Sequence, residues 1–353
     1  MPRLSASLLA TVIVFMPLSP LRAQDDPAVG NPAVGKPAVG KPAVAAPATA
    51  PDALEETLGS WRRIGLKTEF TLWAVTCIDS LRCHAVGDYG VIISTTDGGE
   101  QWTQRLSPNQ FALRGVHFFD DSTGIIAGFR GSCFRTTDGG GSWTAAGIPT
   151  DATLPGMCAV GNTVWLSGAG GTILKSTDRG ARWTVLESGT DAMLDAISFA
   201  DEQHGWATSV QRAVLRSTDG GRTWQDQTVE AFSPITTVYA RSSDECWIAG
   251  YHGLLMRTLD GGLTWQRIEA YNTDYAAIAF DAQGNGWAVG TRGAVVRAEG
   301  NNLRWRLHDL TGAKRLSGIA FLPNNTAIVV GDDGAVFKHD APHPHPATPA
   351  RSE

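Results

Sequence analysis

The sequence predicts an all-β protein, a seven-bladed β-propeller that is closed by its N-terminal strand. A tryptophan recurs every 40 or 41 residues, and a fixed period of this size is typical of solenoids, propellers and repeat arrays. Each period holds four short β-rich runs separated by turn residues, which is the pattern of a four-stranded blade. Glycines recur at fixed places in each period, and no helical periodicity is present. The tryptophans are Trp61, Trp102, Trp143, Trp183, Trp224, Trp265 and Trp305.

Five of the repeats carry a short motif just before the tryptophan, which reads Ser/Thr-x-Asp-Gly-Gly-x-x-Trp with few departures. An Asp in this place can accept hydrogen bonds from backbone groups that follow it, and the next Gly supplies a positive φ. The tryptophan can fold back over the turn and bury a large apolar surface. The motif is the Asp-box, or BNR, repeat, and we expect its carboxylates to be structural rather than catalytic. Its residues are Asp97, Trp102, Asp138, Trp143, Asp178, Trp183, Asp219, Trp224, Asp260 and Trp265.

We name the four runs of a repeat strands A to D, in chain order. In the second repeat they are predicted at Arg114–Phe118, Gly124–Gly128, Cys133–Thr137 and Ser142–Ala145. The last repeat supplies strands A to C and then the array stops, so Trp61–Ile64 is expected to provide its missing strand D. This closure removes an open sheet edge that would invite aggregation. The propeller is therefore expected over residues 60–340.

One pair of positions in strands A and B indicates how the blades pack. Phe118, Phe199 and Phe280 in strand A each stand opposite a glycine of strand B, which leaves room for the ring. In the first repeat these two positions hold Cys77 and Cys83, so we predict a disulfide across that hairpin. Export would permit the oxidation, and two free buried thiols are the alternative. We assign no partner to Cys133, Cys158 and Cys246.

The termini are predicted to lie outside the propeller. Residues 1–23 look like a secretory signal peptide, with Arg3 in a positive start, an apolar run at Leu8–Met16 and a plausible cleavage site. A retained anchor is the alternative, but the run is too short to span a bilayer as an ordinary helix. Residues 24–59 repeat a pentapeptide that begins with Pro-Ala-Val-Gly and predict a flexible spacer, and residues 341–353 are predicted to be a similar disordered tail. We therefore expect an exported protein, periplasmic or secreted, that does not span the membrane.

The turns between strands B and C are the best candidates for partner binding. In a four-stranded blade these turns share one face with the segments that link strand D to the next strand A, while the Asp-boxes lie on the other face. The residue pairs at their tips, which we expect at Asp88-Tyr89 in the first repeat, are not repeats of one another, and variable loops on a rigid scaffold usually carry specificity. Aromatic residues and arginine are over-represented at binding hot spots. The candidates are Tyr89, Phe129, Arg130, Tyr251, His252 and Arg292.

A basic residue also recurs three positions before the Asp of the box, as in Arg135 and Arg216. Either these residues form a positive ring for an anionic partner, or their stems lie along the blade as part of the repeat. We favour the second, structural interpretation, in which the stems of these residues lie along the blade.

The sequence lacks the signatures of several other classes of function. A net charge of −6 and a pI near 5.8 argue against binding to nucleic acid, which requires a basic surface. Cys-x-x-Cys does not occur and the eight histidines are scattered, so no metal site and no cofactor are expected. Ser-His-Asp and phosphate-loop signatures are also missing.

The Asp-boxes and their period resemble the photosystem II assembly factor family and its bacterial relatives, which are seven-bladed BNR propellers. Gly286–Gly293 and Leu215–Trp224 look very like that family's repeat, and the resemblance covers Ser60–Asp340. It implies an exported, non-enzymatic protein that binds a protein partner during assembly or stabilisation of a membrane complex. We expect this protein to act as a monomer.

The Asp-boxes also resemble those of sialidase-like glycoside hydrolases, so a glycosidase or a glycan-binding propeller is the alternative. Sialidases have a Phe/Tyr-Arg-Ile-Pro motif before the first blade, and the nearest string here, Trp61–Gly65, lacks the proline. They also need a Tyr nucleophile, and no spacing singles out one of the five tyrosines. We therefore expect no enzymatic activity.

Overall fold

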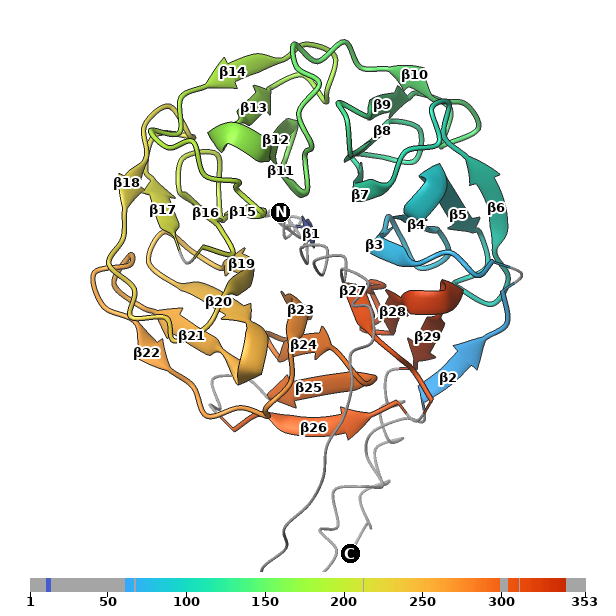
Figure 1. Ribbon diagram of the computed structural model, residues 1–353. Helices are drawn as coiled ribbons and strands as arrows, with labels where there is room; N and C mark the ends of the chain where they lie inside the picture. Colours follow the sequence, from blue (N-terminus) through green and yellow to red (C-terminus); the bar gives the residue numbers. More distant parts are fainter. Residues whose placement is uncertain are drawn as a thin grey trace, which may run out of the picture.

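The computed structural model describes residues 11–13, 61–66, 68–211, 213–298, 304–310 and 312–340. Seven antiparallel sheets stand radially around one axis (Figure 1), which confirms the predicted seven-bladed β-propeller. Within these ranges the helical elements are four 3-10 turns, and none of them is long and apolar enough to cross a membrane.

The sheets follow one another around the ring in chain order (Figure 1). Blade 1 has β3 (Leu72–Cys77), β4 (Cys83–Gly87), β5 (Val91–Thr95) and β6 (Thr103–Leu106). Blade 2 has β7 (Leu113–Phe118), β8 (Gly124–Gly128), β9 (Cys133–Thr136) and β10 (Thr144–Ala145). Blade 3 has β11 (Gly156–Val160), β12 (Thr163–Ser167), β13 (Ile173–Ser176) and β14 (Thr184–Leu186). Blade 4 has β15 (Ala196–Phe199), β16 (Gly205–Thr208), β17 (Val214–Ser217) and β18 (Gln225–Asp226).

The remaining blades complete the ring. Blade 5 has β19 (Ile235–Ala240), β20 (Cys246–Gly250), β21 (Leu255–Thr258) and β22 (Gln266–Arg267). Blade 6 has β23 (Tyr275–Phe280), β24 (Gly286–Gly290), β25 (Ala294–Ala298) and β26 (Arg306–Asp309). Blade 7 has β27 (Leu316–Phe321), β28 (Ala327–Gly331), β29 (Val336–His339) and, as its outermost strand, β2 (Trp61–Ile64). The 3-10 turns are η1 (Asp88–Gly90), η2 (Ala169–Gly171), η3 (Tyr251–Gly253) and η4 (Asp332–Gly334).

The N-terminal strand closes the ring as predicted. β2 pairs antiparallel with β29, from Trp61 opposite His339 to Ile64 opposite Val336. Ile64 is buried, and the indole of Trp61 packs against the ring of His339 at 4.9 Å. Blade 7 is thus built from the two ends of the propeller.

One outer strand is shorter than predicted. In blade 2 the fourth strand, β10, begins at Thr144 rather than at Ser142. The reason is that the box tryptophan folds back over its own turn and does not extend the ladder. In blade 1, for example, Trp102 donates from Nε1 to the carbonyl oxygen of Gly99 at 3.2 Å.

Phenylalanines of the inner strands fill the seams between blades. Phe118 lies opposite Gly124, and a Cβ on Gly124 would come within 2.8 Å of the ring. Each of these rings also receives an aromatic side chain from strand B of the preceding blade. Phe199 stacks on Trp165 at 3.9 Å, and Phe118 stacks on His84 at 4.0 Å. The core is therefore a ring of similar interblade contacts.

Two sets of loops define two faces of the ring. The Asp-box turns meet the A–B turns, as the bond from Gly98 N–H to the Leu81 carbonyl at 2.8 Å shows. The B–C turns meet the segments that link strand D to the next strand A, as the bond from Ser107 N–H to the Gly90 carbonyl at 2.8 Å shows. We call this second surface the B–C face.

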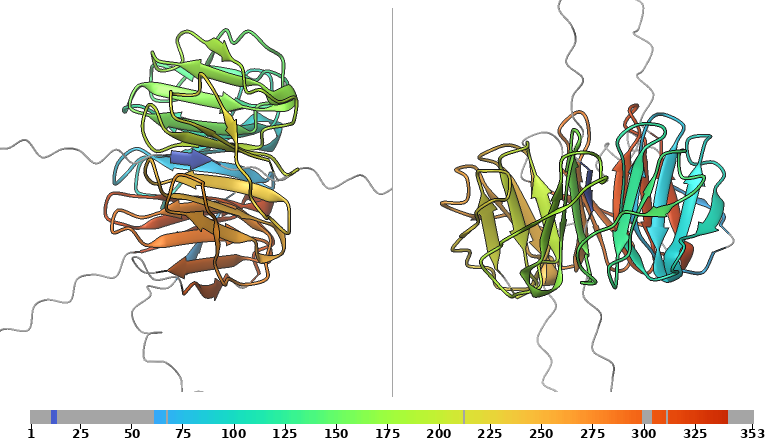
Figure 2. Two further views of the ribbon diagram at one scale, coloured as in Figure 1. Left: turned by 90° about the vertical axis from the view of Figure 1, so that its left-hand side faces the viewer. Right: turned by 90° about the horizontal axis from the view of Figure 1, so that it is seen from above.

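A short strand, β1 (Thr11–Ile13), lies at the centre of the ring (Figures 1 and 2). It pairs antiparallel with β11 and makes blade 3 a five-stranded sheet. These residues belong to the predicted signal peptide, and the rest of residues 1–23 lies outside the described part of the chain. The predicted spacer (24–59) and tail (341–353) also lie outside it.

Candidate functional site

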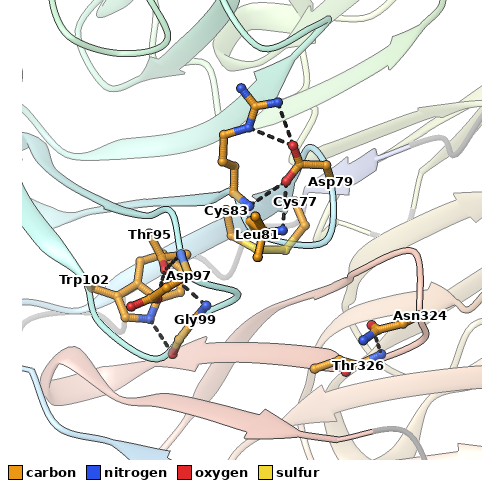
Figure 3. Close-up of a disulfide and its surroundings, with 11 residues drawn as sticks. Cys77, Asp79, Leu81, Cys83, Thr95, Asp97, Gly99, Trp102, Asn324 and Thr326 are labelled. Carbon is orange, nitrogen blue, oxygen red and sulfur yellow. Dashed lines mark hydrogen bonds and ion pairs between the residues drawn. A yellow bond between two sulfur atoms is a disulfide. The ribbon is translucent and has the colours of Figure 1, made fainter.

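The Asp-box carboxylates hold their own turns together. In blade 1, Oδ1 of Asp97 accepts a hydrogen bond from the Thr95 hydroxyl at 2.8 Å (Figure 3) and another from the N–H of Gln101 at 3.0 Å. In blade 2, hydrogen bonds from the side chain and N–H of Ser142 and from Thr136 lower the pKa of Asp138 to about 2. The carboxylates of Asp178, Asp219 and Asp260 accept the equivalent bonds. The Asp-box carboxylates are therefore hydrogen-bond acceptors that stabilise their own turns.

Basic residues before the boxes reach the next blade. Nε of Arg135 donates to the Arg179 carbonyl at 2.9 Å, and Nζ of Lys175 donates to the Gly220 carbonyl at 2.8 Å. Arg216 donates to the Ser243 carbonyl at 3.0 Å. These side chains therefore link neighbouring blades, which matches the structural reading of the recurring basic positions rather than an open positive ring.

A disulfide joins Cys77 and Cys83, which lie directly opposite each other in β3 and β4 (Figure 3). In the loop that it closes, Asp79 accepts hydrogen bonds from the N–H groups of Leu81 and Arg82 at 2.8 and 2.7 Å. The hairpin is thus held both covalently and by its own carboxylate. Cys133, Cys158 and Cys246 are buried free thiols.

The B–C turns differ from the prediction by one residue. In η1 the N–H of Val91 donates to the Asp88 carbonyl, and the two residues between them have φ of 54° (Tyr89) and 70° (Gly90). This is a type I′ turn whose loop is Tyr89-Gly90, not Asp88-Tyr89, because the second glycine occupies a central position. The equivalent left-handed residues of blades 2, 5, 6 and 7 are Arg130, His252, Arg292 and Asp333.

The candidate tip residues therefore fall into two groups. Those in the left-handed position project from the face: Tyr89 is 66% exposed beside Phe70, and Arg130 lies over the ring of Phe111. His252 is held by a 2.8 Å hydrogen bond between its Nδ1 and the Ser233 hydroxyl. The preceding residues, Phe129 and Tyr251, turn inward.

Phe129 and Tyr251 contribute to the inner part of the face. The guanidinium of Arg114 lies 4.8 Å from the centroid of the Phe129 ring. Tyr251 is half-buried, and burial together with the charge of Asp274 raises its pKa. The structure thus separates exposed tips from residues that line the ring centre.

A second cluster lies where the inner strands begin. Five of them have a β-bulge at the same place, and in blades 1 and 2 the bulged residues are Trp73 and Arg114. The guanidinium of Arg114 lies 3.4 Å from the Trp73 ring centroid, and that of Arg315 lies 4.3 Å from it. Nε1 of Trp73 donates to Asp88 at 2.7 Å. We call Trp73, Arg114 and Arg315 the inner cluster.

The inner cluster places cations in a sheltered site. Arg114 is 2% exposed, and burial lowers its pKa to about 9. Arg315 pairs with Asp332 at 3.0 Å. The sequence patterns did not single out these residues, although an arginine in a buried inner strand was a usable signal.

The inner cluster continues into a shallow hollow of about 640 Å³ at blades 6 and 7. Its lining includes Arg292, Lys314, Arg315 and Asp332. The B–C face thus combines exposed aromatic residues, arginines and a hollow in one region. Among the described residues, no group of three or more His, Cys, Asp and Glu side chains is placed to hold a metal ion.

Comparison with known proteins adds a family and several similar structures. The family model described as Photosynthesis system II assembly factor YCF48 matches residues 53–160 and 181–273, which together exceed half of the chain. No curated protein matches the chain.

A solved structure of YCF48 bound to D1 peptide is 19% identical, with a TM-score of 0.68 over 79% of this chain and 96% of that one. YCF48 from Cyanidioschyzon merolae is 20% identical, with a TM-score of 0.66 over 79% of this chain and 98% of that one. A virginiamycin B lyase from Staphylococcus aureus with quinupristin is 16% identical, with a TM-score of 0.69 over 80% and 99%. At these identities the likeness establishes the propeller fold.

Proposed function

Because this chain belongs to the Photosynthesis system II assembly factor YCF48 family, we propose that it is a non-catalytic propeller that binds a protein partner. In this role it helps to assemble or stabilise a membrane or envelope complex. The similar YCF48 structure with a bound D1 peptide supports a protein segment as the class of ligand.

The observation that carries the proposal is the composition and geometry of the B–C face. Left-handed backbone is uncommon for residues other than glycine, yet Tyr89, Arg130 and Arg292 all adopt it at φ between 52° and 58°. A type I′ turn with such residues holds their side chains away from the blade. Aromatic and arginine side chains placed on rigid turns are the residue types of binding hot spots.

The inner cluster adds electrostatic selectivity. Arg114 and Arg315 lie on opposite neighbours of blade 1, both over the indole of Trp73. In a sheltered site such charges act more strongly than in water. They favour acidic or carboxylate groups in the part of the partner that contacts the inner cluster.

We also propose that the protein is exported and monomeric. The predicted signal peptide supports export to the periplasm or beyond, and the Cys77–Cys83 disulfide is compatible with an oxidising compartment. Closure of the ring by the chain's own strand supports a monomer.

The glycosidase alternative has less support from the geometry. The Asp-box carboxylates serve their own turns, and burial raises the pKa of Tyr239 to about 12, which opposes a role as nucleophile. The likeness to a lyase extends to the fold alone.

The test is capture of the partner from the protein's own envelope, followed by mass spectrometry. One variant replaces Tyr89, Arg130 and Arg292 with Asn, a residue that tolerates left-handed backbone. The control variant replaces Leu259 and Leu263 with Asn, because they are 57% and 81% exposed and belong to an Asp-box loop on the other face. We expect the tip variant to keep its melting temperature and lose the partner, and the control to keep both. Equal loss in the two variants would refute the proposed face.

A further inference from the structure

The inner edge of blade 3 accepts an additional strand. β1 pairs with β11 through Thr11 opposite Ala159, Val12 opposite Cys158 and Ile13 opposite Met157. β1 lies at the ring centre (Figures 1 and 2), and it also contacts the inner strands β7 and β15 on either side of β11. The backbone groups of an inner strand that do not bond to strand B face this centre and are free to pair.

β11 is suited to strand addition because its ladder is regular. The ladder with β12 runs without a register shift from Gly156 opposite Ser167 to Val160 opposite Thr163. In five other blades a bulge lies just before the equivalent stretch of the inner strand, and bulges twist an edge away from further pairing. In blade 3 the bulge position holds Pro155, which has no N–H to donate. β15 is also regular but one residue shorter than β11.

Asp195 lies beside the end of this edge. Gly156 abuts the start of β15, since a Cβ on it would lie 3.3 Å from the carbonyl carbon of Ala196. The adjacent Asp195 is fully buried, and its Oδ2 accepts the Val210 N–H at 2.8 Å. Within the part of the chain that the structure describes, its Oδ1 has no hydrogen-bond partner. A buried carboxylate oxygen without a donor is costly, so a ligand that supplies one would be stabilised there.

The direction of pairing between β1 and β11 connects the edge of β11 with Asp195. β1 runs antiparallel to β11, so the residue that follows a segment bound like Thr11–Ile13 lies opposite Gly156, next to Asp195. A lysine or arginine at that place would present N–H donors and a positive charge to Oδ1.

We propose that the inner edge of β11 binds an extended segment of the partner protein by strand addition. The segment is β-branched over three residues, like Thr11–Ile13, and a basic residue follows it on the C-terminal side to meet Asp195. The proposal rests on the proposed function, since it specifies how a protein partner enters the ring. Main-chain bonds supply affinity in such a mode, and side-chain positions supply specificity.

The first experiment tests the strand site in the purified full chain. Under mild oxidation, Val12→Cys is expected to form a disulfide with Cys158, and the pair Thr11→Cys with Ala159→Cys is expected to do the same. The mismatched control is Thr11→Cys with the natural Cys158. Directly opposite residues of an antiparallel pair lie within disulfide reach. The matched pairs should therefore form their disulfide at least about tenfold faster than the mismatched pair. Equal rates, or no disulfide in either matched pair, would overturn the strand site.

The second experiment tests the partner chemistry by competition. The peptide Gly-Thr-Val-Ile-Lys-Gly, capped at both ends, is added to the Val12→Cys chain, and Gly-Thr-Val-Ile-Glu-Gly is its matched control. The Lys peptide should slow the disulfide about fivefold more than the Glu peptide, the factor that an ion pair of about 1 kcal/mol gives. Asp195→Asn, which keeps an acceptor for the Val210 N–H, should remove this difference.

The remaining outcomes are also decisive. A disulfide that neither peptide slows would mean that the edge serves only the chain's own segment, and would overturn the proposal. Equal competition by both peptides would refute the proposed contact between Asp195 and the basic residue of the segment. Neither measurement involves the captured partner or the tip residues, so failure here and failure of the B–C face are distinguishable.

Discussion

Nζ of Lys338, in the last strand of blade 7, lies 2.6 Å from Oε1 of Glu100, in the first Asp-box. Glu100 also accepts a bond from Arg62 of β2 at 2.8 Å. Hydrogen bonds from Arg62 and Lys338 lower the pKa of Glu100. One carboxylate of blade 1 therefore contacts both chain ends that make up blade 7, at the seam where the ring closes.

Removal of β2 should open this seam. A chain that lacks residues 1–64 loses every β2 pair with β29 and leaves that strand's edge unpaired. We expect a large fall in the urea midpoint and a tendency to aggregate, since exposed strand edges pair with other chains. A chain that lacks residues 1–59 retains β2 and is the matched control. Similar midpoints for the two truncations would contradict the closure.

The Phe–Gly pairs make a specific prediction about core packing. A Cβ at Gly205 would lie 2.5 Å from the ring of Phe199, which is itself stacked on Trp165. Gly205→Ala should therefore lower the free energy of unfolding by about 1–3 kcal/mol through overpacking. Gly65→Ala is the control, because nothing lies within 4 Å of a Cβ there. Chemical denaturation checks both, and equal stability would contradict the packing.

The disulfide in blade 1 should contribute to stability. Cys77 and Cys83 close a short loop, so we expect Cys77→Ala with Cys83→Ala to lower the free energy of unfolding by about 2 kcal/mol. A reductant should lower the urea midpoint of the natural chain toward that of the variant and leave the variant unchanged. A natural chain that is insensitive to reductant would refute the prediction.

His84 should make the fold sensitive to acid. Burial, with a smaller contribution from Arg82, lowers its pKa from 6.5 to about 4. The unfolded chain then binds the proton more readily than the folded chain, so stability is full above pH 6.5 and falls as the pH drops from 6.5 toward 4.

The measurement compares unfolding free energies at two pH values. His84→Phe preserves the stack on Phe118 and removes the titrating group. Between pH 7 and pH 5 it should reduce the loss of stability by about 2 kcal/mol relative to the natural chain. An unchanged loss would show that other groups dominate. Burial also lowers the pKa of His117 to about 4. His117 is present in both chains, so its contribution to the loss of stability is the same in the two and cancels in the comparison.

The sequence by itself determined the architecture, because the features that build a blade are local and repeat. The tryptophan ladder, the Asp-boxes and the Phe–Gly pairs depend on residues within one repeat, and their copies reinforce one another. The pairing of Trp61–Ile64 with the last repeat could be predicted because that repeat supplies only strands A to C and lacks strand D.

Tertiary structure decided the details of the candidate site. The B–C loops are displaced by one residue because the second glycine, as at Gly90, takes a central place in the turn. Trp73, Arg114 and Arg315 come from three different blades, and bulges in β3 and β7 bring the first two to the ring centre. A bulge and an interblade contact depend on register and on packing across blades, so residues that are far apart in the chain meet in ways that a single repeat does not encode.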